Sequence, residues 1–183
     1  MTDTMSDIHD VRAARRGSAR PVLHVVLRGG APFDEPSRHA LDGIDIVSFA
    51  RGERAATRVV RDGMRHLLLS VPDPLMSSDH GRLLHALGEW MLDDPASKNG
   101  AIVRGARTRS SPVSPGTAFA LGSTVFLLDE ARLEAGAALD VSAGALRPPL
   151  PELATFHPGF QAAIDVVARV ATSGLPALVL GET

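Results

Sequence analysis

Leu67-Leu68-Leu69-Ser70-Val71, closed by Pro72-Asp73-Pro74, is the stretch that decides the fold class. It is a short apolar run that ends in turn residues, which is typical of a β-strand. The same pattern recurs on both sides of it, at residues 22–27, 44–49, 82–87, 89–92, 101–103, 117–120 and 124–128. No long helical period interrupts the series. The sequence therefore predicts an all-β sandwich or barrel over residues 21–129.

Size and composition allow a full hydrophobic core. The chain has 183 residues, of which 44% are hydrophobic, enough for one domain plus a fragment. It carries 19 basic and 21 acidic residues, a balance that argues against general attraction to nucleic acid or membranes. Cysteine is absent, which excludes disulfides and cysteine-based zinc sites.

The first twenty residues are polar and rich in arginine, so we expect residues 1–20 to form a flexible, disordered tail. A basic arm that touches nucleic acid is the alternative interpretation. The tail lacks the apolar stretch of a signal peptide, and no run approaches the roughly 20 residues of a membrane helix. We therefore expect a cytoplasmic protein without a membrane partner or a direct nucleic-acid partner.

The composition changes after the last predicted strand. Residues 130–152 are rich in alanine, glycine, leucine and proline, and residues 147–151 predict a stiff, extended linker. Beyond it, Phe160, Ile164, Val167 and Ala171 recur at helical spacing, and residues 178–180 form an apolar, strand-like run. A helix and one strand cannot bury a core alone. Residues 153–183 are therefore expected to be a piece of a larger domain.

Three motifs follow one another along the predicted sandwich: Arg51-Gly52, Ser77-x-x-His80 and Ser97-Lys98-Asn99-Gly100. Each motif is weak alone, but their order on an all-β chain is specific. With the run that ends at Trp90-Met91-Leu92-Asp93-Asp94, they make residues 21–129 resemble a forkhead-associated (FHA) domain. That family binds phosphothreonine peptides through loops at one end of a β-sandwich. The resemblance implies the same fold and the same kind of ligand here.

The resemblance assigns five residues to phosphopeptide binding. Arg51 is the expected phosphate clamp, because a guanidinium offers a planar fork of donors to a dianionic phosphate. Ser77 is expected to donate its hydroxyl to a phosphate oxygen, and Ser78 to add a contact. Asn99 is expected to hydrogen-bond the ligand main chain, while Lys98 adds positive potential.

Three further residues are expected to support the site. Gly52 follows the clamp arginine, and His80 braces the binding loop in the family rather than touching ligand. Gly100 completes an Asn-Gly turn, since both residues tolerate positive φ.

The match to the family is incomplete. Ala50 replaces the glycine that usually precedes the arginine, Ala101 stands where threonine is common, and Arg104 where a second asparagine often lies. The stretch from Arg51 to Ser77 is also longer than usual. These departures keep open an FHA-fold interaction domain that binds protein without phosphate dependence.

We expect no catalytic or metal site. Ser77 lacks the Gly-x-Ser-x-Gly elbow of a hydrolase, and its spacing from His80 assures no catalytic alignment. Asp93 and Asp94, as neighbours on a strand, point to opposite faces, as do His80 and His85. Neither pair can therefore act on one substrate or one ion.

Residues 153–183 resemble the opening of a sigma-54-interacting AAA+ ATPase domain, in which a helix and a strand lead into a Gly-Glu-Thr-Gly-Thr-Gly-Lys phosphate loop. Gly181 would be the first glycine of that loop, but no lysine follows. No cofactor is expected here, and ATP with Mg²⁺ only in a complete motor domain. The resemblance implies a phosphothreonine sensor in a bacterial transcription regulator, with sigma-54 RNA polymerase as partner through the missing domain. The alternative is a fragment of an ATP-hydrolysing activator.

Overall fold

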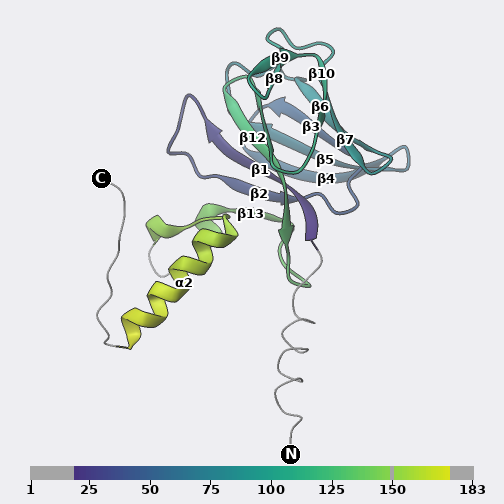
Figure 1. Cartoon of the computed structure of the whole chain (residues 1–183). Helices are drawn as coiled ribbons and strands as arrows, with labels where there is room; N and C mark the ends of the chain where they lie inside the picture. The colour runs from purple at the N-terminus through teal and green to yellow at the C-terminus, as the bar shows by residue number, and fades with distance from the viewer. Residues whose placement is uncertain (1–18, 149–150, 174–183) are drawn as a thin grey trace, which may run out of the picture. The chain divides into compact units, whose positions relative to one another are not determined.

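Two β-sheets pack face to face in the computed structural model, which describes residues 19–148 and 151–173 (Figure 1). The predicted all-β sandwich is thereby confirmed. The larger sheet has the order β13 (Asp140–Ser142), β2 (Ser37–Ala40), β1 (Ala19–Arg28), β12 (Thr124–Arg132), β11 (Thr117–Leu121), β8 (Ala101–Val103) and β9 (Ala106–Thr108). The smaller sheet has the order β10 (Ser110–Val113), β7 (Glu89–Asp93), β6 (Gly81–Ala86), β3 (Ile46–Arg51), β5 (Met64–Val71) and β4 (Ala55–Arg61).

Strand direction in the smaller sheet brings three loops to one end. β3 and β5 run parallel, β6 is antiparallel to β3, and β7 is antiparallel to β6. β3, β5 and β7 therefore all point the same way. The segments that follow them, residues 52–54, 72–80 and 94–100, leave the sheet at the same edge.

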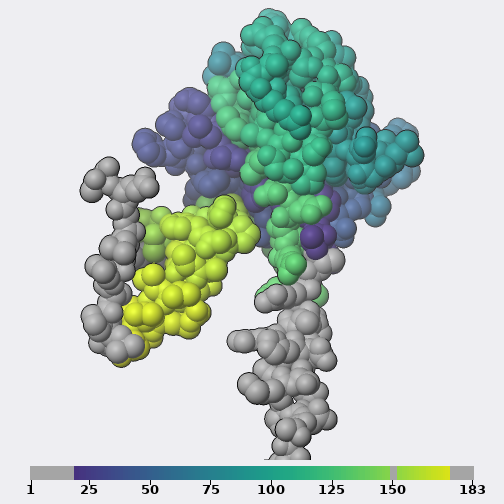
Figure 2. Space-filling view, viewed as in Figure 1, coloured from purple at the N-terminus to yellow at the C-terminus, as the bar shows by residue number. Residues whose placement is uncertain are grey.

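Aromatic rings from both sheets fill the interior. Phe49 of the smaller sheet lies 5.9 Å from Phe119 and 4.9 Å from Phe126, measured between ring centroids, and all three are at most 2% exposed. Such edge-to-face pairs add about 0.5–1.5 kcal/mol each beyond the burial of their area. The space-filling view shows the atoms of the strands packed against one another (Figure 2).

Five strands were not predicted from the sequence, because they are short or lie toward sheet edges, where polar residues are tolerated. They are β2, β4, β9, β10 and β13. The stretch between Arg51 and Ser77 contains β4, which pairs with β5 and forms the edge of the smaller sheet.

The expected tail and linker both differ from the structure at their ends. β1 starts at Ala19, because Ala19 and Arg20 pair with Arg132 and Ala131 of β12. β12 thus runs past residue 129, and Leu133 beyond it is 5% exposed. Residues 130–148 therefore contain strand and buried structure rather than an extended linker alone. The rest of the predicted tail, residues 1–18, lies outside the described residues.

Asp73 ties the loop after β5 to the other sheet. Its carboxylate accepts hydrogen bonds from the backbone N–H of Leu75 at 2.9 Å, the N–H of Ser123 at 2.7 Å and the hydroxyl of Thr124 at 2.8 Å. Burial raises the pKa of Asp73, but these donors outweigh it, so the pKa lies below its usual value. The aspartate is therefore ionised at neutral pH and holds the 72–76 turn in place.

The chain from residue 141 onward forms a separate compact unit. It contains two short 3-10 helices, η1 (Ala143–Ala145) and η2 (Pro151–Leu153), and the predicted helix, α2 (Pro158–Thr172). Pro158 occupies the first turn of α2, and the N–H of Phe160 donates to Nδ1 of His157 at 3.1 Å. The predicted strand at 178–180 and Gly181 lie outside the described residues. Within residues 19–148 and 151–173, no helix is long and apolar enough to cross a membrane.

Candidate functional site

The loops that follow β3, β5 and β7 are joined by hydrogen bonds. The backbone N–H of Arg51 donates to the carbonyl oxygen of Ser77 at 2.9 Å. The Nδ2 atom of Asn99 donates to the carbonyl oxygen of Leu75 at 3.3 Å. The structure thus brings the segments that carry Arg51, Ser77 and Asn99 to one end of the sandwich. Gly52 anchors the first loop, because its N–H donates to Val71 at 3.0 Å.

His80 is a buried strut beneath the second loop. Its Nδ1 atom accepts a hydrogen bond from the backbone N–H of Ser77 at 2.8 Å. Its own N–H donates to the carbonyl oxygen of Phe49 at 3.0 Å, and the residue is only 1% exposed. The imidazole therefore holds the backbone of Ser77 and leaves the hydroxyl free to point elsewhere. This contact also argues against a hydrolytic Ser77–His80 pair, because the ring nitrogen serves a backbone N–H.

A buried aspartate and serine shape the third loop. Asp94 accepts hydrogen bonds from the N–H of Ser97 at 3.0 Å and from its hydroxyl. The Ser97 hydroxyl oxygen in turn accepts from the N–H of Gly100 at 2.9 Å, and Gly100 has a φ of 74°. Asp94 is fully buried and Ser97 is 3% exposed. The buried side chains of Asp94 and Ser97 therefore hold the turn that carries Asn99.

Sequence reasoning assigned no role to Asp94 or to the hydroxyl of Ser97. The signal that could have found them is their spacing, since an aspartate side chain commonly binds backbone N–H groups two or three residues later. Arg109 was also missed. Its Nη1 atom donates to the carbonyl oxygen of Ser97 at 2.6 Å. Because Arg109 lies between β9 and β10, this hydrogen bond ties the third loop to a neighbouring segment.

Free positive charge lies on two of these loops. Arg51 and Lys98 are both exposed, and in the described part of the chain neither side chain has a carboxylate partner. Ser78 is exposed beside the half-buried Ser77. An exposed guanidinium and an exposed ammonium, on loops linked to the one that carries Ser77 and Ser78, suit an anionic ligand with several acceptor oxygens.

Asp34 links the first two loops from the side. Its Oδ2 atom lies 2.9 Å from Nη2 of Arg54 and 2.8 Å from Nη2 of Arg28. Arg28 also donates to the carbonyl oxygen of Pro72 at 2.7 Å. The hydrogen bond from Arg28 is the main cause that lowers the pKa of Asp34. Arg54 and Arg28 are thus committed to structure, which distinguishes them from Arg51.

Among the described residues, no three histidine, cysteine, aspartate or glutamate side chains lie close enough together to hold a metal ion. His85 instead stacks on Trp90, with 4.5 Å between ring centroids. Asp93 lies 3.4 Å from Nη2 of Arg82, on the opposite side of the strand from buried Asp94.

No family model and no curated protein matches the chain. Among solved structures, it is similar to the FHA domain of CT664 protein from Chlamydia trachomatis, with 24% identity and a TM-score of 0.43 over 60% of this chain and 96% of that one. It is also similar to the FHA domain of an Arabidopsis thaliana hypothetical protein, with 19% identity and a TM-score of 0.45 over 62% and 88%. The yeast Pml1 splicing factor gives 18% identity and a TM-score of 0.48 over 72% and 91%.

Proposed function

We propose that residues 21–129 form an FHA-type module that binds phosphothreonine-containing peptides or proteins. The observation that carries the proposal is the hydrogen bond between Arg51 and Ser77. It joins the backbone of Arg51, whose side chain is exposed, to the backbone of Ser77 in the next loop. The assigned roles of Arg51, Ser77, Ser78, Lys98 and Asn99 are part of this proposal.

The physical basis is a match of charge and donors. A phosphothreonine carries about −1.5 to −2 charges near neutral pH and three strong acceptor oxygens. Arg51 can supply two parallel N–H donors, and Ser77 one O–H donor. The loops are held in place by His80 and Asp94 without ligand, so little ordering entropy is lost on binding.

The test is calorimetry with one peptide in phosphorylated and unphosphorylated form, selected from a phosphothreonine library. We expect binding of the phosphorylated form alone. Arg51→Ala should abolish it while the melting temperature changes little, because the side chain is exposed and unpaired. Arg132→Ala is the matched control, since Arg132 is exposed on β12 of the other sheet. Unaltered binding in Arg51→Ala would contradict the clamp assignment.

The second candidate is an FHA-fold interaction domain without phosphate dependence. The departures at Ala50, Ala101 and Arg104 favour it. Ala101 is fully buried in β8, and Arg104 takes a φ of 51° in the following turn. Equal affinity for the two forms of the peptide would favour this alternative.

We further propose that the module is the signal sensor of a sigma-54-dependent transcription regulator. The support for this proposal is the resemblance of residues 153–183 to the opening of a sigma-54-interacting AAA+ domain. That opening begins with a helix, and α2 lies at the corresponding place in this chain. The polymerase partner and any ATP hydrolysis belong to that wider proposal. A downstream coding sequence that continues with Gly-Thr-Gly-Lys after Thr183 would support it, and any other continuation would remove its basis.

A further inference from the structure

A groove of about 450 Å³ runs over the outer face of the smaller sheet and begins at the candidate site. At the loop end of the sheet, the groove is lined by residues 78–81 and by Pro95 and Ala96, most of which belong to the second and third loops. From this end the groove follows β3 to its first residue, Ile46. The groove is therefore continuous with the loops that carry Ser77 and Asn99.

The floor of the groove is unusually apolar for an outer sheet face. Alternate residues of β3 and β5, namely Ile46, Ser48, Ala50 and Leu68, line it and are half-buried. Because side chains alternate along a strand, their neighbours Val47, Phe49, Leu67 and Leu69 fill the core instead. Both faces of β3 and β5 are thus mostly apolar or small, whereas a solvated outer face normally alternates with polar residues.

The far end of the groove carries positive charge. Arg61, at the end of β4, and His66 of β5 line it there. Arg61 is exposed and has no carboxylate partner among residues 19–148 and 151–173. Arg82, on β6, lines the groove beside β3, and its Nη2 atom lies 3.4 Å from Asp93. The one free cation of the described lining is therefore Arg61.

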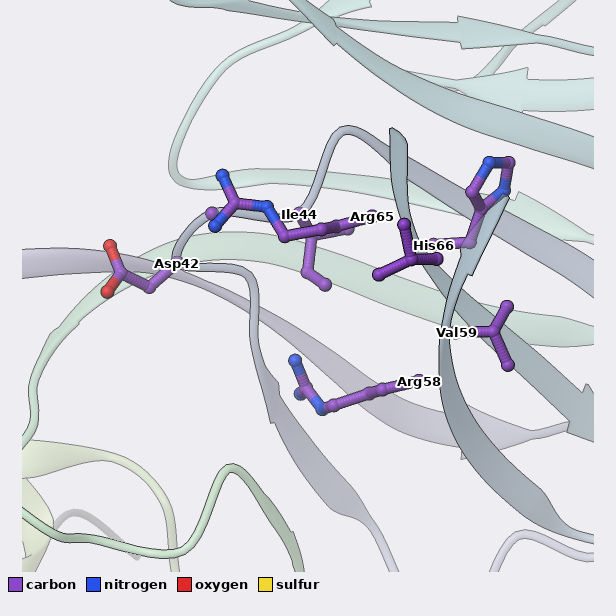
Figure 3. A pocket seen from close by; sticks show the side chains of 8 residues that line it. Asp42, Ile44, Arg58, Val59, Arg65 and His66 are labelled. Carbon is purple, nitrogen blue, oxygen red and sulfur yellow. The ribbon is translucent and has the colours of Figure 1, made fainter. Parts of the chain in front are cut away.

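His66 separates this groove from a second cavity on the other side of the hairpin, of about 280 Å³. Figure 3 shows the His66 ring and Val59 pointing away from the guanidinium groups of Arg58 and Arg65. Arg58 is bound to Asp140 at 2.8 Å, and Arg65 lies 4.0 Å from Asp45. The cationic side chains of the second cavity are thus already partnered, which leaves Arg61 as the better candidate for an external anion.

The length of the groove sets a register. Arg51 ends β3 at the loop end, and Ile46, paired with His66, begins it at the other. Five steps at about 3.3 Å per residue place His66 about 17 Å from the loop end of the strand. Arg61 pairs with Met64, two residues further along, so it lies about 23 Å from the loop end in the strand direction. An extended ligand covers the distance to Arg61 in about six to seven residues.

We propose that this groove binds an extended, partly apolar segment of the phosphorylated ligand, with an acidic side chain reaching Arg61 about six to seven residues from the phosphothreonine. The inference rests on the proposed function for its starting point. Small and apolar floor residues accept an extended chain, and the free guanidinium of Arg61 selects a carboxylate at the far end. Charge complementarity of this kind contributes to specificity and to the association rate.

The experiment is a selection from a library with one fixed phosphothreonine and seven random positions on each side. It is run with the unaltered chain, Arg61→Gln and Arg61→Glu. Arg132→Gln changes the net charge equally and is the control. We expect Asp and Glu to be enriched on one side at about the sixth or seventh position, and this enrichment to be lost in Arg61→Gln. Arg61→Glu should instead enrich Lys and Arg there, while the phosphothreonine requirement stays the same.

Synthetic peptides then measure the effect. Replacing the selected acidic residue by its amide should weaken binding about two- to fivefold, as for an exposed ion pair. The same replacement should have no effect in Arg61→Gln. Binding of phosphothreonine without an Arg61-dependent acidic preference would overturn this inference and leave the proposed function intact.

Three other results are also decisive. If no phosphothreonine peptide binds, an unphosphorylated library is used, and Arg61-dependent acidic selection from it would support the groove while the proposed function fails. Absence of any selection overturns both. A chain that dimerises at micromolar concentration, and becomes monomeric in Arg61→Glu, would assign the groove to a second copy and overturn the peptide inference.

Discussion

The backbone N–H of Ser77 donates a hydrogen bond to Nδ1 of His80 at 2.8 Å, so a buried imidazole sets the position of a loop that faces solvent. The ring is enclosed by core residues, while Ser77 itself is half-buried. The position of this loop therefore depends on how tightly the core residues pack around His80.

Replacing His80 by alanine should both destabilise the fold and weaken ligand binding. The change leaves the N–H of Ser77 without its partner and creates a cavity, which together cost about 2–4 kcal/mol. Chemical denaturation measures the loss. His85→Ala is the control, because His85 is exposed, and a loss there as large as in His80→Ala would show that the buried contact is not the cause.

The hydroxyl of Ser97 is expected to matter more for stability than that of any exposed serine. Ser97→Ala removes the acceptor for the N–H of Gly100 and one donor to Asp94, at a cost of about 1–3 kcal/mol. The altered turn should also displace Asn99 and lower affinity for a phosphothreonine peptide. Ser114→Ala, at an exposed position, should change neither quantity. A fully stable Ser97→Ala chain would refute the role of this hydroxyl.

Gly122 is required by both conformation and space. Its φ is 61°, and a Cβ atom there would lie 2.8 Å from Oδ2 of Asp73 and 2.9 Å from the backbone of Leu75. Gly122→Ala should therefore destabilise by about 3 kcal/mol or more, because the overlap adds to the backbone strain. Gly116 has a φ of 81° but open space around it, so Gly116→Ala should show the strain alone, about 1 kcal/mol. Equal melting temperatures for the two variants would contradict this comparison.

Asp140 should make the fold sensitive to acid. Its Oδ1 atom lies 2.8 Å from Nη2 of Arg58 and 2.8 Å from Nδ1 of His39. Burial raises the pKa of Asp140, but the hydrogen bonds from Arg58 and His39 outweigh it and hold the pKa well below its usual value. A lowered pKa means that the ionised carboxylate stabilises the fold above the unfolded-state pKa of about 3.9. This stabilisation is lost as the pH falls below that value.

The measurement is the free energy of unfolding of Asp140→Asn and the unaltered chain from pH 7 to pH 2. At neutral pH the variant should be less stable by about 1–2 kcal/mol, a modest figure because the side chain is partly exposed. The difference should shrink below about pH 4. Glu134→Gln is the control, because Glu134 is exposed and its carboxylate has no partner within residues 19–148 and 151–173. A difference that stays constant with pH would show that Asp140 acts by shape and not by charge.

The sequence alone determined the strand-rich core and the kinds of side chain in the loops. Apolar runs such as 67–71 form strands that bury alternate side chains, and Pro72 and Asp73 end this one, because strand and turn preferences are local. The start of α2 at Pro158 is equally local. Edge strands such as β4 were missed because their pairing depends on a neighbour more than on their own residues.

Tertiary structure decided where the loops meet. Whether β5 runs parallel or antiparallel to β3 is a property of the sheet, and the parallel arrangement is what places Arg51 next to Ser77. The buried partners His80 and Asp94 then convert that proximity into fixed geometry. The outer groove likewise depends on two neighbouring strands, β3 and β5, whose outer faces are mostly apolar or small. Only the pairing of β5 with β4 brings Arg61 to the end of this groove. Contacts between residues distant in sequence carry these features, so no local pattern could have specified them.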